Sequence, residues 1–336
     1  MAPQAGEVPV VYHPAGRDAE LRAVWEEVRA GRWMGVRDLL RRTRESGSGW
    51  ADWTRRTQVL GAAAAESNVV EIWLSEEPGS IEALVMTARV RTERTLSAYR
   101  QRPFSGERVS HHLRDIDGLA FAARQACRAA SEALPADPVP WVCLLALALV
   151  DPGAVHAEHR KPSGDPLLGP GPWGLMEGAE QRDAGNREAW HRLFKVMCSR
   201  GTSPGAFARY ADNAARMGSA VRMLPLYASM EQYRSRRARH ASTWLHWNSA
   251  QAVHYAMRAY TDWFCRSNPA DCSELDLNYL AHALHAADHA EAAHVFEAIG
   301  PYATPVPWRY VVDDPADWQE RFLRCRTYSA ARGRHR

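Results

Sequence analysis

Residues 277–301 read LNYLAHALHAADHAEAAHVFEAIGP, and this stretch decides the expected fold. Apolar residues recur in its first half at intervals of three and four, the spacing that places side chains on one face of an α-helix: Leu280, Ala281 and Leu284. The pattern repeats after a short turn near Asp288: Ala292, Phe296 and Ile299. Pro301 ends the second helix because proline cannot continue it. The stretch therefore predicts two consecutive helices.

Helical periodicity extends outward from this stretch over most of the chain. The segment 113–134 is rich in alanine, and small side chains let helix backbones approach closely. Further helices are expected at 53–66, 81–99, 186–198 and 242–267. Two short segments, 8–12 and 69–74, could instead form β-strands, but no series of alternating segments follows them. We therefore expect an all-α protein.

The periodicity breaks between Asp151 and Trp173. Five prolines with glycines between them exclude a regular helix there. Long segments of this kind inside compact domains are uncommon, and they are often functional loops or linkers. We therefore expect an N-terminal helical half at 1–150, a Pro/Gly-rich loop at 151–173 and a C-terminal helical half at 174–330.

Three places resemble tetratricopeptide helix pairs: the pair at 276–301, and what look like repeat junctions at 129–141 and 183–190. The resemblance implies antiparallel helix pairs stacked as an irregular α-solenoid, whose concave groove binds a protein or peptide. Trp141 and Trp190 are 49 positions apart, whereas regular repeats recur about every 34 residues. The chain also resembles a group of uncharacterised actinobacterial helical proteins, a resemblance that implies no particular activity.

Composition narrows the class of protein. A net charge of +3 argues against a protein that mainly coats nucleic acid. Lys161 and Lys195 are the only lysines, so the arginines reflect a GC-rich genome more than phosphate binding. The six cysteines form no C-x-x-C pair, and a reduced cytoplasmic setting is expected. The most apolar stretch, 141–150, is too short to span a bilayer, so we expect no membrane association.

No motif for nucleotide binding or hydrolysis occurs, and we assign no catalytic residue and no cofactor. One alternative is a metalloenzyme. Glu-x-x-His occurs twice, a spacing that builds di-iron sites in helical bundles: Glu188 with His191, and Glu291 with His294. With fourteen histidines in the chain such spacings are expected by chance, so we favour solvated helix faces.

Aromatic and histidine side chains concentrate near the C-terminal end of the chain. They suggest a groove that holds a partner or a small ligand: Trp244, His246, Trp247, Tyr255, His282 and His285. Core packing is the simpler interpretation, because aromatic residues dominate cores in any case. A regulatory module that binds a small ligand is the second alternative. The leading hypothesis is a non-enzymatic scaffold for a protein or peptide, with its partner, pathway and oligomeric state left open.

Overall fold

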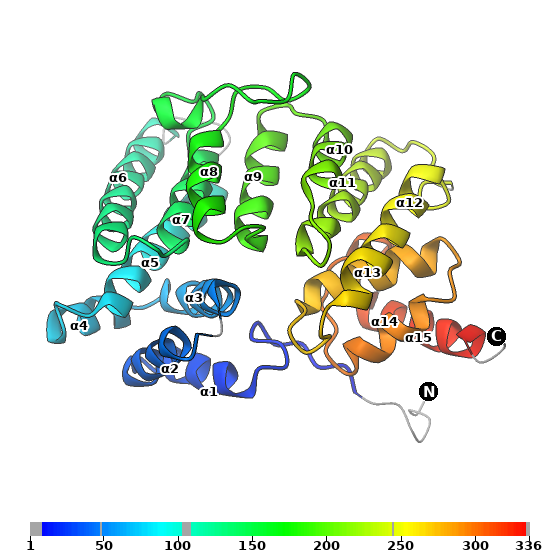
Figure 1. Cartoon of the computed structure of the whole chain (residues 1–336), viewed down its shortest axis with the longest axis horizontal. Coiled ribbons are helices and arrows are strands. Elements are labelled where there is room, and N and C mark those ends of the chain that lie inside the picture. The colour runs from blue at the N-terminus through cyan, green and yellow to red at the C-terminus, as the bar shows by residue number, and fades with distance from the viewer. Residues whose placement is uncertain (1–8, 48, 103–108, 244, 334–336) are drawn as a thin grey trace. The chain divides into compact units, whose positions relative to one another are not determined.

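The protein is described by a computed structural model that covers residues 9–47, 49–102, 109–243 and 245–333. Within these ranges the secondary structure is helical, with fifteen α-helices, α1 to α15, joined by turns and short 3-10 segments (Figure 1). No β-strand occurs in those ranges, although Val11 forms an isolated bridge with Tyr302, and Lys161 with Gly171. The prediction of an all-α protein is confirmed.

The chain divides into two compact units. The N-terminal unit runs from Asp18 to Thr202. The C-terminal unit begins at Ser203 and also includes the segment that ends at Arg17. The Pro/Gly-rich loop, at which the sequence predicts a division, lies within the N-terminal unit.

The N-terminal unit is built around α5, which packs against α3, α4, α6 and α7. Side chains on more than one face of α5 are buried, including Val85, Met86 and Arg89. Nine α-helices belong to the described part of this unit: α1 (Ala19–Arg29), α2 (Met34–Glu45), α3 (Trp50–Ala64), α4 (Val69–Glu76), α5 (Ile81–Arg100), α6 (Val109–Ala133), α7 (Val139–Leu147), α8 (Trp173–Arg182) and α9 (Arg187–Ser199).

The loop at 151–173 is pinned to the N-terminal unit by polar contacts. The Asp151 carboxylate accepts hydrogen bonds from the backbone N–H groups of Val155 and His156, and it lies 2.7 Å from Nδ1 of the fully buried His159. Arg200, just past the end of α9, donates to the carbonyl oxygens of His159 at 2.5 Å and of Ala148 and Asp151 at 3.1 Å. The loop is therefore a packed part of its unit.

The C-terminal unit packs α10 against α11, α11 against α13, and α14 against α13 and α15. Its core includes three rings in mutual contact, with centroids 5.5 to 5.8 Å apart: Phe296, Trp308 and Phe322. The described helices of this unit are α10 (Pro204–Ala214), α11 (Leu224–Ala238), α12 (Ala250–Arg258), α13 (Glu274–Ala286), α14 (Ala292–Ile299) and α15 (Trp318–Gly333).

The segment before α1 completes the C-terminal unit. The Val11 N–H donates to the carbonyl oxygen of Pro301 at 2.7 Å. The Arg17 backbone N–H donates to the Glu274 carboxylate at 2.9 Å, and its guanidinium donates to the carbonyl oxygen of Ala298 at 3.1 Å. These contacts tie the segment to α13 and α14.

Two local predictions differ from the structure. Residues 69–74 belong to α4 and not to a strand, because Val69, Val70 and Trp73 lie together on the buried face of a helix that packs on α5. The long helix expected at 242–267 is broken. Turns precede α12, which begins only after the Ser249 side chain caps its first turn. A π-helical turn then covers Ala259–Trp263.

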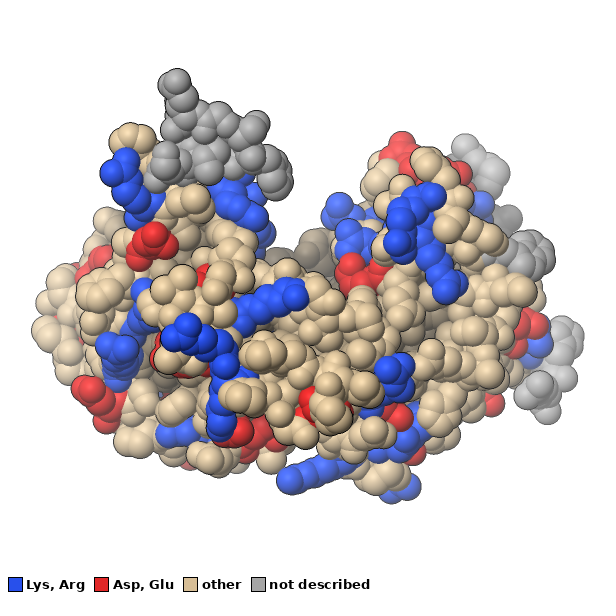
Figure 2. Space-filling view, turned by 90° about the horizontal axis from the view of Figure 1, so that it is seen from above, with Lys and Arg blue, Asp and Glu red and all other residues tan. Residues whose placement is uncertain are grey.

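No helix in the described ranges is both long and apolar enough to cross a membrane. One face of the molecule appears in Figure 2 with its charged side chains coloured. Basic and acidic groups are interspersed there among uncharged residues. The charged residues on that face therefore form small mixed groups instead of one continuous basic surface.

The packing of α7 on α8 depends on a glycine. A Cβ atom added at Gly178 would lie 2.1 Å from the Trp141 ring, which the Arg182 guanidinium covers at 4.4 Å from the ring centroid. We predict that Gly178→Ala lowers the free energy of unfolding by about 1–3 kcal/mol, because the indole must shift. Urea denaturation followed by circular dichroism measures the change.

Gly118 on α6 provides the matched control, because an added Cβ there meets nothing within 4 Å. Gly118→Ala is expected to raise the free energy of unfolding by up to about 1 kcal/mol, since alanine favours the helix. Equal effects of the two substitutions would contradict the close approach of α7 and α8 at Gly178.

Candidate functional site

A pocket of about 420 Å³ opens beside the end of α11 and the start of α12, and we call it the α11–α12 pocket. Pockets for small molecules commonly begin near this volume. Nine residues line it: Ser229, Gln232, Arg236, Ser242, Leu245, His246, Ser249, Gln251 and Ala252. All of them lie within the C-terminal unit, so one folded unit forms the pocket by itself.

The break between α11 and α12 creates the pocket. The chain leaves α11 through His240, whose backbone has a positive φ of 53°, and turns back before Ser249. The Ser249 hydroxyl accepts a hydrogen bond from the backbone N–H of Ala252, which fixes the first turn of α12. One uninterrupted helix over 242–267 would have left no such recess.

Charge in the pocket is one-sided. Among the nine described residues that line it, Arg236 is the charged one and none is acidic. No carboxylate of the described residues lies within ion-pair distance of Arg236, whereas Arg237 on the same turn of α11 pairs with Asp313 at 2.7 Å. The Arg236 guanidinium therefore remains available to a ligand.

A contrasting arginine cluster lies elsewhere in the same unit. Asp212 accepts hydrogen bonds from Arg222 at 2.9 Å and from Arg258 at 3.0 Å. Arg258 also pairs with Asp262 at 3.1 Å. Because these charges neutralise one another, the cluster braces α10 against α12, and each of its arginines already has an acidic partner.

His246 is one of the lining residues and is 7% exposed. Its Nε2 lies 2.8 Å from the Ser229 carbonyl oxygen, so this nitrogen carries the proton and donates. Nδ1 is then an acceptor, and no described residue donates a hydrogen bond to it. Burial lowers the pKa of His246, and the nearby Arg236 adds to that effect, so the neutral imidazole is the resting form.

An aromatic chain leads from the pocket to the core. The His246 ring packs against Trp247 with centroids 5.0 Å apart, Trp247 packs against His282 at 4.9 Å, and His282 packs against Trp308 at 5.4 Å. Trp247 Nε1 and His282 Nδ1 are both buried without a hydrogen-bond partner among the described residues. The structure thus brings three of the sequence-predicted groove residues together.

The other predicted groove residues are distributed differently. Tyr255 lies beside the pocket, where its hydroxyl accepts a hydrogen bond from Gln251 at 3.1 Å. His285 does not line the pocket and contacts Phe296, Tyr328 and Ser329. Trp244 lies outside the described residues.

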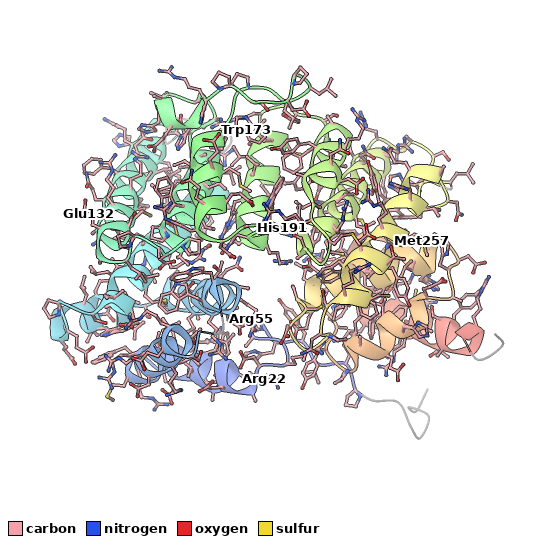
Figure 3. The ribbon with its side chains drawn as sticks, in the orientation of Figure 1. Arg22, Arg55, Glu132, Trp173, His191 and Met257 are labelled. Carbon is pink, nitrogen blue, oxygen red and sulfur yellow. The ribbon has the colours of Figure 1, made fainter. Side chains whose placement is uncertain are left out.

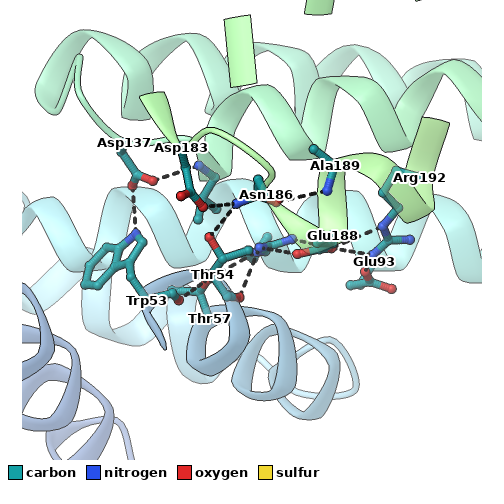
Figure 4. A network of polar contacts seen from close by, with 12 residues as sticks. Trp53, Thr54, Thr57, Glu93, Asp137, Asp183, Asn186, Glu188, Ala189 and Arg192 are labelled. Atoms are coloured by element: carbon teal, nitrogen blue, oxygen red, sulfur yellow. Dashed lines mark hydrogen bonds and ion pairs between the residues drawn. The ribbon is translucent and has the colours of Figure 1, made fainter. Parts of the chain in front are cut away.

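The predicted metal ligand Glu188 occupies a buried ion-pair network in the N-terminal unit (Figure 4). Its two carboxylate oxygens accept hydrogen bonds from Arg89 at 2.8 and 2.7 Å, and Arg192 adds a contact at 3.0 Å. Arg192 also donates to Glu93 at 2.6 Å. The two arginines lower the pKa of Glu188 against the opposing effect of burial, so the carboxylate is charged.

Further hydrogen bonds extend this network to α3. The Arg89 guanidinium donates to the Thr57 hydroxyl and to the Thr54 carbonyl oxygen, both at 3.3 Å. The Asn186 side-chain amide donates to the Thr54 hydroxyl at 3.2 Å. Residues of α3, α5 and α9 thus share one buried polar cluster, which holds these helices in register.

The remaining candidate ligands have other surroundings. His191 lies on α9 (Figure 3), and burial lowers its pKa well below the usual value. Glu291 lies 3.6 Å from His289, and His294 Nδ1 lies 2.8 Å from the Tyr260 hydroxyl. Over the described ranges, no group of three or more His, Cys, Asp or Glu side chains is arranged to hold a metal ion. Glu188 and His191 belong to one unit, Glu291 and His294 to the other.

Comparison with protein families, with curated proteins and with solved structures found no match to this chain. The interpretation of the site therefore depends on its own residues.

Of the seven polar residues that line the pocket, His246 is among the groove residues predicted from the sequence. The other six are not: Ser229, Gln232, Arg236, Ser242, Ser249 and Gln251. Arginine is abundant throughout the chain, so the sequence does not distinguish an arginine without an acidic partner from the paired ones. A clue existed at 239–249, where the run RHASTWLHWNS contains few strong helix formers. That run could have suggested the break that forms the pocket.

We predict that acid destabilises the protein through His282. Burial, with positive charge on Arg321 nearby, lowers the pKa of this imidazole from 6.5 to about 3. The unfolded chain takes up a proton as pH falls through 6.5, while the folded chain does not. The stability that the neutral His282 contributes is therefore fully present well above pH 6.5 and is lost as pH falls toward 3. Through His282, the free energy of unfolding at pH 5 is about 2 kcal/mol lower than at pH 7.

The measurement is urea denaturation at pH 7 and pH 5. The His282→Gln variant has no imidazole at this position. Between pH 7 and pH 5 its free energy of unfolding should therefore fall by about 2 kcal/mol less than that of the unaltered protein. His111→Gln, at an exposed position of α6, serves as the control and should leave the pH dependence unchanged. An unchanged pH dependence in His282→Gln would refute the prediction.

A second prediction concerns the buried ion pair. Glu188→Leu leaves the Arg89 guanidinium buried without a counter-charge, so the free energy of unfolding should fall by about 3–5 kcal/mol. The double substitution Arg89→Met with Glu188→Leu should recover most of this loss, because no unpaired charge then remains in the core. Thermal and urea denaturation measure both.

Glu231→Ala is the matched control, because it removes a half-exposed pair with Arg234. A change below about 1 kcal/mol is expected for it. If Glu188→Leu were no more harmful than Glu231→Ala, the buried pair would not hold the N-terminal unit together.

Proposed function

We propose that this protein is a non-enzymatic binding scaffold of irregular, tetratricopeptide-like helix pairs, and that its C-terminal unit holds a peptide segment of a partner at the α11–α12 pocket. Contacts between helices that are consecutive in the chain support the pairing: α6 with α7, α10 with α11, and α13 with α14. The last of these pairs covers most of the stretch 277–301 that carries the resemblance.

The observation that carries the proposal is the pocket and its exposed apolar edge. Leu245 lines the pocket and is 65% exposed, next to the unpaired Arg236. A volume of about 420 Å³ accommodates one or two side chains and not a folded domain. An extended peptide could place an apolar side chain on Leu245 and a polar group inside. Interfaces of this kind obtain much of their affinity from a few such anchors.

Selection of random peptides by phage display against the full chain tests the proposal. Enriched peptides should bind in isothermal titration calorimetry, and Leu245→Asp should weaken them by about tenfold or more, since one buried apolar anchor contributes on the order of 1.4 kcal/mol or more.

Val155→Asp provides the control for added surface charge, because Val155 is 74% exposed and lies in the other unit. It should leave binding unchanged. If no peptide is enriched, or if enriched peptides bind Leu245→Asp as tightly as the unaltered chain, the scaffold proposal is wrong.

A second candidate function is a small-ligand regulatory module. The polar lining of the pocket favours it, because five side chains besides Arg236 and His246 offer hydrogen-bonding groups: Ser229, Gln232, Ser242, Ser249 and Gln251. The two candidates share the same pocket and differ in whether the occupant is free or part of a chain.

A further inference from the structure

We propose that the α11–α12 pocket selects a negatively charged group, a carboxylate or phosphate, that carries a hydrogen-bond donor close by. The inference rests on the proposed function to the extent that this pocket is the binding site. It adds the chemical class of the occupant, which the shape of the pocket alone does not specify.

The charge of the lining residues favours an anionic ligand. Arg236 is the one charged group among nine lining residues, and no lining residue is acidic. Its neighbours on α11 are occupied: Arg234 donates to Glu231 at 2.8 Å, and Arg237 donates to Asp313 at 2.7 Å. A guanidinium binds carboxylate and phosphate oxygens through paired hydrogen bonds, and a cationic ligand would find no counter-charge in the lining.

The hydrogen-bonding groups of the lining indicate that the ligand also carries a donor. Ser229 and Ser249 already donate their hydroxyl protons to the carbonyl oxygens of Pro225 and His246. The Gln251 amide nitrogen donates to Tyr255. His246 donates through Nε2 to Ser229, which leaves its Nδ1 as an acceptor. An anion alone would be repelled by that lone pair, whereas a ligand N–H or O–H next to the anion satisfies it.

The position of the pocket at the start of α12 also favours negative charge. Ser249 and Gln251 cap and open α12, so the positive end of that helix lies at the pocket wall. The partial charge there adds to the field of Arg236 and has the same sign. Three separate features, the guanidinium, the lack of acidic groups and the helix start, thus favour negative charge at one place.

Two sources of such a group are possible, and the experiment separates them. A small free molecule offers an acid with a neighbouring hydroxyl. A peptide offers an aspartate, glutamate or phosphorylated side chain next to its own backbone N–H. In the first arm, glycerol 3-phosphate and malate are titrated calorimetrically into the full chain, with glycerol as the neutral comparison. In the second arm, an Asp- or Glu-containing peptide from the phage selection is compared with its Asn or Gln counterpart.

Arg236→Gln is the test variant, because it removes the charge and keeps an amide donor. The Arg236→Gln substitution should lower the affinity for the anionic ligand about tenfold or more, as expected for the loss of a charged hydrogen bond. Arg239→Gln is the matched control. Arg239 is exposed, lies three residues further along the chain and does not line the pocket, so its replacement should change affinity less than twofold.

Four results would overturn the inference: glycerol binding as tightly as glycerol 3-phosphate, an Asn or Gln peptide binding as tightly as its acidic counterpart, Arg239→Gln weakening binding as much as Arg236→Gln, or no binding of any anionic probe. Peptides that bind at Leu245 regardless of charge would defeat the inference and leave the scaffold proposal standing. Free anions that bind through Arg236 in the absence of any selected peptide would support the inference and defeat the peptide scaffold.

Discussion

The ion pair between Arg89 and Glu188 is the constraint on which the N-terminal unit depends. Both side chains are almost completely buried, and two charges in an apolar interior are tolerated only when they are paired and hydrogen-bonded. Arg89 comes from α5 and Glu188 from α9, while α3 supplies the Thr57 hydroxyl and the Thr54 carbonyl oxygen. Without α5 or α9 one of the two charges would lack its partner, and without α3 the Arg89 guanidinium would lose two hydrogen-bond acceptors. The pair thus fixes helix register in a way that apolar contacts do not.

Much of the helical framework could be predicted from the sequence, since helix faces follow from the spacing of apolar residues. The helices at α3, α5, α9 and α13 begin and end within a few residues of the expected positions. The failures have physical causes. The short segment 69–74 could have formed a strand, but it belongs to α4, which buries Trp73 and packs on α5. In 242–267 the helical periodicity predicted one continuous helix, although the chain turns before Ser249.

Fewer residues of the candidate site than of the helices could be predicted from the sequence. The sequence predicts His246, Trp247 and His282 as groove residues, and these three rings form one connected set. Arg236 could not be recognised from the sequence. It differs from Arg234 and Arg237 in having no carboxylate partner among the described residues, and only the three-dimensional structure determines which arginines find partners. Glu188 was considered for its spacing to His191, whereas its actual partners lie on other turns and another helix. Spacing identifies which residues share a face, but it does not identify what lies opposite that face.

The C-terminal unit has a further consequence for how the chain is made. Val11 and Arg17 contact Pro301, Glu274 and Ala298, so the first pieces of this unit to leave the ribosome wait for partners synthesised some 250 or more residues later. At about 5–20 residues per second this interval lasts roughly a quarter of a minute to a minute. The N-terminal unit is complete well before then. Docking of this segment is consequently a late step in folding of the C-terminal unit, and until it occurs the hydrogen-bonding groups of the segment face water.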